Sequence, residues 1–152
     1  MKNNSKIIHC KNYHWDSVGK KQYKTDSTNF KDISRYSLLG EGENEQELNF
    51  QTRYFEIQPG GYSSLEFHRH PHSVIIIRGS GSVILGDEVH PLSLHDVVFI
   101  SPETIHQFHA DNEEPMGFIC IVDRYRDRPS IPDDNMLDQT IPNPETRKKV
   151  RK

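Results

Sequence analysis

The chain has 152 residues, a formal net charge of -3, 33% hydrophobic residues and 27% charged residues. This charge excludes a general electrostatic attraction to nucleic acid, and no segment is apolar enough to span a bilayer. The two cysteines show no framework spacing, and the N-terminal residues lack the apolar core of a secretory signal. We therefore expect a cytoplasmic protein without a nucleic-acid or membrane partner.

The apolar residues are unevenly distributed, and they divide the chain into three parts. Residues 1–48 are polar with scattered aromatics, which predicts an N-terminal arm with a short strand at 33–39. Residues 49–126 are rich in Val, Ile, Leu and Phe and predict the compact core. Residues 127–152 are polar and proline-rich, which predicts a flexible tail of mostly coil with one helical turn near 134–137.

Strand signals follow one another closely in the core. Apolar and polar residues alternate over 50–57, a turn is expected at 59–61, and a further strand is expected at 62–69. Gly86-Asp87 is a two-residue hairpin signal. Eight or nine short strands without a convincing amphipathic helix predict an all-β sandwich or barrel.

Four potential metal ligands lie in two stretches: Glu66, His68 and His72 in LEFHRHPH, and His106 in ETIHQF. Glu66 and His68 would face the same way on a strand, about 6.6 Å apart. His68 and His72 would lie about 13 Å apart on a straight strand, so both can reach one ion only if the chain turns. Pro71 gives a reason for a turn between them.

Two other interpretations of these histidines stay open. In the first, His68, His70 and His106 hold the ion, and His72 lies beside it as a pocket base. In the second, the histidines line a polar pocket that holds no metal. His106 belongs to every metal-binding arrangement because it would come from a separate strand.

Residues 53–126 resemble the cupins, a family of small β-barrels built on the jelly-roll plan. The spacing of the first cupin motif is matched by Gly60, Glu66, His68, His72 and Gly79. Glu66 stands where the family has a histidine, and His72 stands where it has a glutamate. This spacing favours His72 over His70 as a ligand.

The second cupin motif is matched mainly at its histidine. Its positions correspond to His95, Ser101, Glu103, His106 and Ala110, of which only His106 keeps the family residue. The resemblance implies a jelly-roll barrel that binds one divalent transition metal (Mn, Fe, Ni, Co or Zn) through Glu66, His68, His72 and His106.

The resemblance also implies an enzyme that acts on a small organic molecule, as a metal-dependent oxygenase, isomerase or lyase. Several polar side chains are expected at the mouth of the pocket: Arg53, Tyr54, Tyr62, His70 and Gln107. Of these, His70, Tyr54 and Gln107 are the candidates for catalysis. The alternatives are a non-catalytic sensor or small-molecule-binding protein and a structural dimer with a closed metal site. By analogy with the fold, we expect a homodimer.

Overall fold

The fold is known from a computed structural model, which describes residues 3–24 and 28–152. The parts of the predicted arm at 1–2 and 25–27 lie outside the described residues. The strands are β1 (Cys10–Lys11), β2 (His14–Trp15), β3 (Lys21–Gln22), β4 (Lys31–Leu39), β5 (Phe50–Tyr62), β6 (His72–Arg78), β7 (Gly81–Leu85), β8 (Glu88–Leu92), β9 (Val97–Ile100), β10 (His106–His109) and β11 (Met116–Asp123). The helices are η1 (Glu43–Glu45, a 3-10 helix), α1 (Asp134–Thr140) and α2 (Pro144–Lys149).

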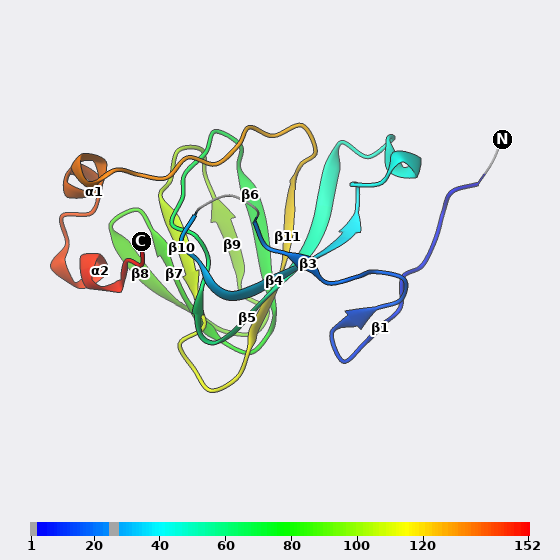
Figure 1. Cartoon of the computed structure of the whole chain (residues 1–152), viewed down its shortest axis with the longest axis horizontal. Coiled ribbons are helices and arrows are strands. Elements are labelled where there is room, and N and C mark those ends of the chain that lie inside the picture. Colours follow the sequence, from blue (N-terminus) through cyan, green and yellow to red (C-terminus); the bar gives the residue numbers. More distant parts are fainter. Residues whose placement is uncertain (1–2, 25–27) are drawn as a thin grey trace.

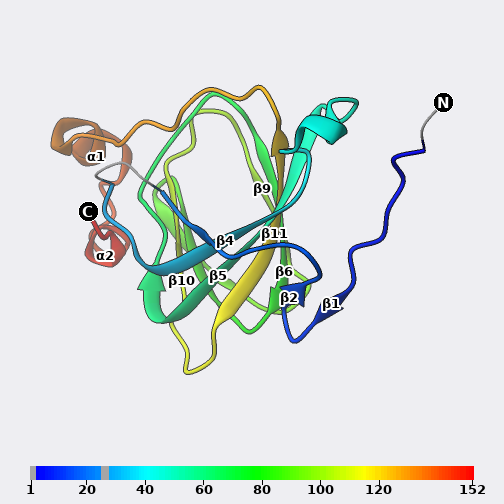
Figure 2. The same cartoon turned by 45° about the vertical axis from the view of Figure 1, so that its right-hand side comes forward.

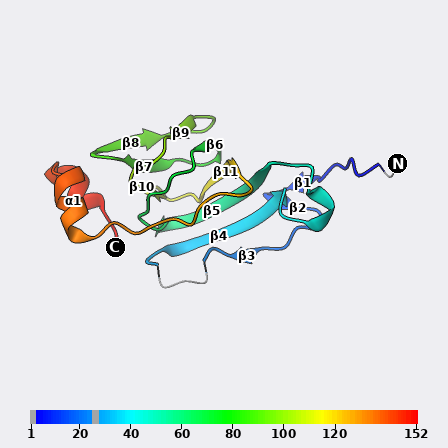
Figure 3. The same ribbon diagram turned by 90° about the horizontal axis from the view of Figure 1, so that it is seen from above.

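One antiparallel sheet forms the body of the molecule. Its strand order is β8-β7-β10-β5-β11-β6-β9, with β4 paired to β5 and β3 paired to β4. The sheet curls on itself, so that β4 and β5 form one wall while β8 and β9 lie on the opposite wall (Figures 2 and 3). This confirms the prediction of an all-β jelly-roll barrel.

The apolar core fills the space inside the curled sheet. The alternation predicted for 50–57 is present, because Phe55 and Ile57 point inward and are 6% and 0% exposed. The larger apolar cluster also draws on the inward faces of the neighbouring strands, through Val74, Ile76, Val83, Ile100, Phe108, Met116, Phe118, Cys120 and Val122. The core therefore fills the barrel next to the end where β6 and β10 begin with His72 and His106.

The predicted turn at 59–61 is wrong, because β5 continues through these residues to Tyr62. Gly60 has a φ of 80°, which an L-residue with a side chain adopts with difficulty. A Cβ placed on Gly61 would lie 2.5 Å from the carbonyl oxygen of Lys31, so β4 and β5 approach each other closely here. The register of β4 on β5 also shifts at this place, which makes the segment a bulge in the strand.

The N-terminal arm lies against the outer side of the barrel. β1 and β2 pair only with each other, and Figure 1 shows them at the opposite end of the molecule from α1 and α2. The ring of Trp15 packs on Tyr54 with a centroid separation of 4.6 Å and on Tyr36 with a separation of 6.0 Å. The predicted strand at 33–39 is present as the longer β4.

The C-terminal segment contains more helix than the sequence predicted. Its first residues are coil, but α1 and α2 follow and pack on the barrel (Figure 1). Leu137 and Ile141 are each 1% exposed and belong to a second apolar cluster with Leu65, Ile84 and Ile105. In the described part of the chain, no helix combines the length and apolar character that crossing a membrane requires.

Candidate metal centre

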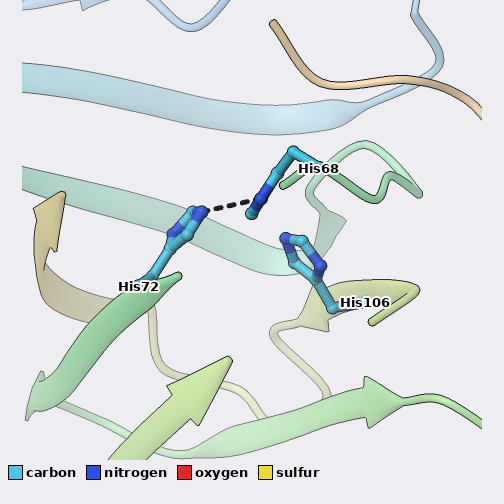
Figure 4. Close-up of side chains that lie close together, drawn as sticks. All are labelled: His68, His72 and His106. Atoms are coloured by element: carbon cyan, nitrogen blue, oxygen red, sulfur yellow. Dashed lines mark hydrogen bonds between the residues drawn. The ribbon is translucent and has the colours of Figure 1, made fainter. Parts of the chain in front are cut away.

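Three histidines meet inside one end of the barrel. His72 is the first residue of β6, His106 is the first residue of β10, and His68 lies in the connection that leads from β5 to β6. One ring nitrogen from each lies within 4.8 Å of the others. Figure 4 shows the three rings turned toward a common centre, with Nε2 of His68 2.7 Å from Nε2 of His72.

The connection before β6 brings the first two histidines together. Glu66 and Phe67 form only isolated bridges, and the chain bends at residues 69–70 before β6 begins. The predicted turn before His72 is therefore present, although the strand expected at 62–69 is reduced to those bridges. The turn folds His72 back beside His68, which a straight strand would prevent.

Backbone carbonyl groups orient two of the rings. Nδ1 of His68 lies 2.7 Å from the carbonyl oxygen of His70, and Nδ1 of His106 lies 2.9 Å from that of Thr104. A carbonyl oxygen only accepts, so each Nδ1 carries the proton and donates. Each Nε2 is thereby left with its lone pair, the state in which imidazole binds a metal.

The charge state of the cluster also suits a metal. Burial lowers the pKa of His72, and the neighbouring His106 and His68 lower it further. Burial likewise lowers the pKa of His106 to about 4, although the charge of Glu66 opposes this shift. A lowered pKa keeps the rings of His72 and His106 neutral, and neutral imidazoles that converge in this way fit a divalent transition ion.

Glu66 lies beside the three histidines. Its Oε1 is 3.8 Å from Nε2 of His106, while its Oε2 accepts hydrogen bonds from Ser64, at 2.7 Å, and from Lys24. Burial opposes ionisation, but the charge of Lys24, together with His106 and these hydrogen bonds, lowers the pKa of Glu66. The carboxylate is thus ionised within reach of the centre, with one oxygen held by Lys24 and Ser64.

His70 occupies a different position from the three converging rings. Its ring stacks on that of His68 at a centroid separation of 3.7 Å, and its Nδ1 lies 2.8 Å from Oδ1 of Asp127. The backbone amides of Arg69 and His70 also donate to Asp127. Burial lowers the pKa of His70, and the hydrogen bond that its ring donates to Asp127 opposes that shift. His70 is therefore a neutral imidazole fixed by a carboxylate at the edge of the site.

The structure does not bring the other two catalytic candidates to the site. Tyr54 is fully buried under the N-terminal arm, where its hydroxyl donates to Glu56 at 2.8 Å. Gln107 is fully buried and donates to the carbonyl oxygens of Ser63 and Arg151, both at 2.8 Å. Neither belongs to the described residues that line the cavity next to the histidines.

The cavity has a volume of about 170 Å³ and is lined by His70, His72 and His106 together with apolar rings from the core. It also contains polar residues that were not among the predicted catalytic residues or ligands: Lys24, Arg35, Arg53, Cys120 and Arg126. For Arg53 a signal was present in the sequence, because a charged residue alternates with Phe55 and Ile57 on the inward side of β5. For Arg126, which lies after the last strand, no such pattern exists.

The barrel and its convergent histidines define a jelly-roll β-barrel with a candidate metal site. The family model described as cupin domain matches residues 53–122. A Rhodospirillum rubrum protein named 1-methylthio-D-xylulose 5-phosphate methylsulfurylase is 38% identical over 122 residues, which are 79% of this chain and 75% of that protein. The chain therefore belongs to the cupin family.

Solved structures agree with this assignment over the whole chain. A cupin 2 conserved barrel domain protein from Rhodopseudomonas palustris has a TM-score of 0.86 and 34% identity, covering 97% of this chain and 100% of that chain. A cupin 2 domain-containing protein from Halorhodospira halophila has a TM-score of 0.75 and 36% identity, covering 99% of each chain. The similarity thus includes the N-terminal arm and the C-terminal helices, beyond the barrel.

Proposed function

We propose that the chain is a metal-dependent enzyme that acts on a small phosphorylated sugar carrying a thioether, bound in the cavity beside His68, His72 and His106. The observation that carries this proposal is the convergence of three imidazoles beside a cavity that is also lined by a thiol and several positively charged side chains. Support for the substrate class comes from the Rhodospirillum rubrum relative, which is named for a reaction of a methylthio-substituted xylulose phosphate.

The proposed ligands are the three histidines and Glu66, in keeping with the cupin resemblance. A divalent ion held there would polarise a carbonyl or hydroxyl oxygen of the substrate. His70 is the proposed general base or acid, because its ring lies at the edge of the same cavity with its Nδ1 held by Asp127. The other ring nitrogen of His70 is then available to take a proton from the substrate or to return one.

Cys120 is the thiol of this cavity. Its Sγ lies 3.3 Å from Nη2 of Arg53 and 3.3 Å from Nδ1 of His72. Burial raises the pKa of Cys120, and the charge of Arg53 opposes that rise. Cys120 is 2% exposed and lines the cavity beside the histidines. Its position supports a substrate that contains sulfur over the oxygenase that the sequence also suggested.

The test is turnover of 1-methylthio-D-xylulose 5-phosphate by protein loaded in turn with Mn, Fe, Co, Ni or Zn. The methylthio protons are followed by NMR, with and without an added thiol. We expect their signal to move with at least one metal, and we expect His70→Gln to retain the metal but lose most of the turnover. Binding of the sugar without turnover under every condition would instead support a sensor, and oxygen uptake would support an oxygenase.

We also propose a homodimer in the cytoplasm. On the edge strand β9, Val97 and Phe99 are each 68% exposed, and Ile121 of β11 adds a further partly exposed apolar side chain. An apolar patch on a sheet face supports self-association. Light scattering should give twice the chain mass for the wild type and a lower mass for Phe99→Lys. A wild-type monomer at high concentration would contradict this part of the proposal.

A further inference from the structure

Three arginines gather on one side of the cavity. Arg35 comes from β4, Arg53 comes from β5, and Arg126 follows β11, so three separate segments contribute. All three line the cavity that also contains His72 and His106. Arg53 and Arg35 point inward from neighbouring strands, where Arg35 is paired with Phe55 and Arg53 with Ser37.

These guanidinium groups form no ion pair within the part of the chain that the structure describes. Among the described residues, none of the ion pairs includes Arg35, Arg53 or Arg126. Arg126 donates only to oxygens of neutral groups, the side chain of Gln51 at 2.9 Å and the carbonyl of Asp123 at 3.2 Å. Among the described residues, the one carboxylate that lines this cavity is Glu66, which is paired with Lys24, so none of these residues offsets the three guanidinium charges by an ion pair.

Two of the donors are buried and unused. Nε of Arg35 and Nε of Arg53 are inaccessible and have no hydrogen-bond partner in residues 3–24 and 28–152. Arg53 as a whole is only 8% exposed, and its Nη2 donates to the sulfur of Cys120 at 3.3 Å. Because a buried charged donor without a partner is costly, such an arrangement is kept where a ligand completes it.

The arginines also affect one another electrostatically. Burial lowers the pKa of Arg126, and the charges of Arg53 and Arg35 lower it further. Two other charged side chains lie nearby, Lys24 and Glu41, but both already form ion pairs. Lys24 is paired with Glu66, and Glu41 is paired with Lys21. The uncompensated charge therefore belongs to the three guanidinium groups. Planar guanidinium groups suit phosphate, because each can donate two parallel hydrogen bonds to its oxygens.

We propose that Arg35, Arg53 and Arg126 form an anion subsite that binds the phosphate monoester end of the substrate, while the other end reaches the histidine centre. The proposal deepens the proposed function and rests on it for the nature of the substrate. The distance between the arginines and the histidine centre fits a short molecule. Nη2 of Arg53 and Nδ1 of His72 each lie 3.3 Å from Sγ of Cys120, so only this sulfur atom separates the two side chains. Arg35 and Arg126 lie on the side of Arg53 that leads to β4 and the end of β11.

The experiment measures phosphate binding by protein stripped of metal with a chelator, using calorimetry. The probes are D-xylulose 5-phosphate, D-xylulose and inorganic phosphate. Because the subsite is made by the chain alone, we expect the phosphate ester to bind without metal, more tightly than inorganic phosphate, while D-xylulose does not bind measurably. This expectation holds even if the turnover assay fails, so the two proposals can fail separately.

The variants are Arg126→Gln, Arg35→Gln and, as a matched control, Arg128→Gln, which changes an exposed arginine two residues from Arg126. Loss of one charged hydrogen-bonding group should weaken ester binding by about 10- to 100-fold, since such a bond contributes roughly 1.5–3 kcal/mol. The control should bind like the wild type, and all three should keep the wild-type metal content. Unchanged affinity in both test variants would overturn the proposal.

Three results with the wild type would overturn it without any variant. One is failure of the metal-free protein to bind the ester at millimolar concentration. Another is binding that appears only when metal is restored, which would assign the phosphate to the ion. The third is equal binding of D-xylulose and its 5-phosphate, or tighter binding of inorganic phosphate than of the ester. If the arginine variants still turn over the substrate, a raised KM with little change in kcat supports a role of these arginines in binding.

Discussion

Nε2 of His68 lies 2.7 Å from Nε2 of His72, although four positions separate the two residues in the sequence. Both rings have their Nδ1 atoms engaged, by a carbonyl oxygen for His68 and by the sulfur of Cys120 for His72. Two buried imidazoles can share one proton at this distance, but they share a cation better, since each then contributes a lone pair. The contact therefore fits the proposed metal site, in which an ion would take the place of the shared proton.

The first prediction concerns His106, which belongs to every metal-binding arrangement that the sequence allows. We expect His106→Ala to lower the metal content from about one ion per chain to near zero, because a ligand and not a neighbouring group is lost. Elemental analysis of protein purified without added metal measures this. The control is His90→Ala, whose ring is exposed on β8. Full metal content in His106→Ala would refute the ligand set.

The second prediction distinguishes a ligand from a neighbour at Glu66. If the carboxylate binds the ion, Glu66→Gln should weaken metal affinity more than about 100-fold, beyond the range typical of groups that only orient ligands. This is the result we expect, because Oε1 is already 3.8 Å from Nε2 of His106. A competition titration with a chelator gives the affinity, and Glu88→Gln on the exposed part of β8 is the control. A loss below about tenfold would make Glu66 only the partner of Lys24.

The sequence predicted the barrel and the convergence of the histidines because both depend on short-range sequence patterns. Alternation of apolar residues identifies strands, and Pro71 makes a turn that brings His72 back beside His68. Spacing alone could not decide which oxygen or nitrogen reaches the ion. That depends on competing partners such as Lys24 for Glu66 and Asp127 for His70, which come from distant parts of the chain.

Other features depended on signals that are weak or ambiguous. Pro59-Gly60-Gly61 has the composition of a turn. Because β4 packs closely on β5 here, the segment remains part of β5 and forms a bulge in it. The C-terminal helices are short, and their capping residues are the visible signal: Asp133 accepts from the amide of Met136, and Asn143 precedes a proline at the first position of α2. Their stability comes from burial on the barrel, which composition does not reveal.

The third prediction concerns pH and uses His109, which lies outside the metal centre. His109 is 5% exposed, and its Nε2 is buried without a hydrogen-bond partner among the described residues. Burial and the charge of Lys149 lower its pKa from 6.5 to about 4, against the opposing charge of Asp111. Between pH 6.5 and pH 4, His109 is protonated in the unfolded chain but stays neutral in the folded chain. The stability is therefore complete above about pH 6.5 and falls as the pH decreases toward 4.

His109→Phe should remove this part of the acid sensitivity, since phenylalanine keeps a ring beside Tyr62 and has nothing to protonate. From pH 7 to pH 5 the wild type should lose on the order of 2 kcal/mol more unfolding free energy than the variant. Urea unfolding of the metal-free proteins at both pH values measures the difference. The other buried histidines contribute equally to the pH dependence of both proteins, so their contributions cancel in the comparison. Parallel losses in the two proteins would show that His109 titrates normally.

The last prediction tests whether the C-terminal helices stabilise the barrel. Leu137 of α1 is 1% exposed and packs with Leu65, Ile84 and Ile105, so Leu137→Ala leaves a cavity between the helix and the sheet. We expect a loss of about 2–4 kcal/mol in unfolding free energy, measured by urea unfolding followed by tryptophan fluorescence. Gln139→Ala on the exposed side of α1 should change little, because it removes no packed apolar group. Equal stability of Leu137→Ala and the wild type would mean that α1 is detached in solution, as a flexible tail would be.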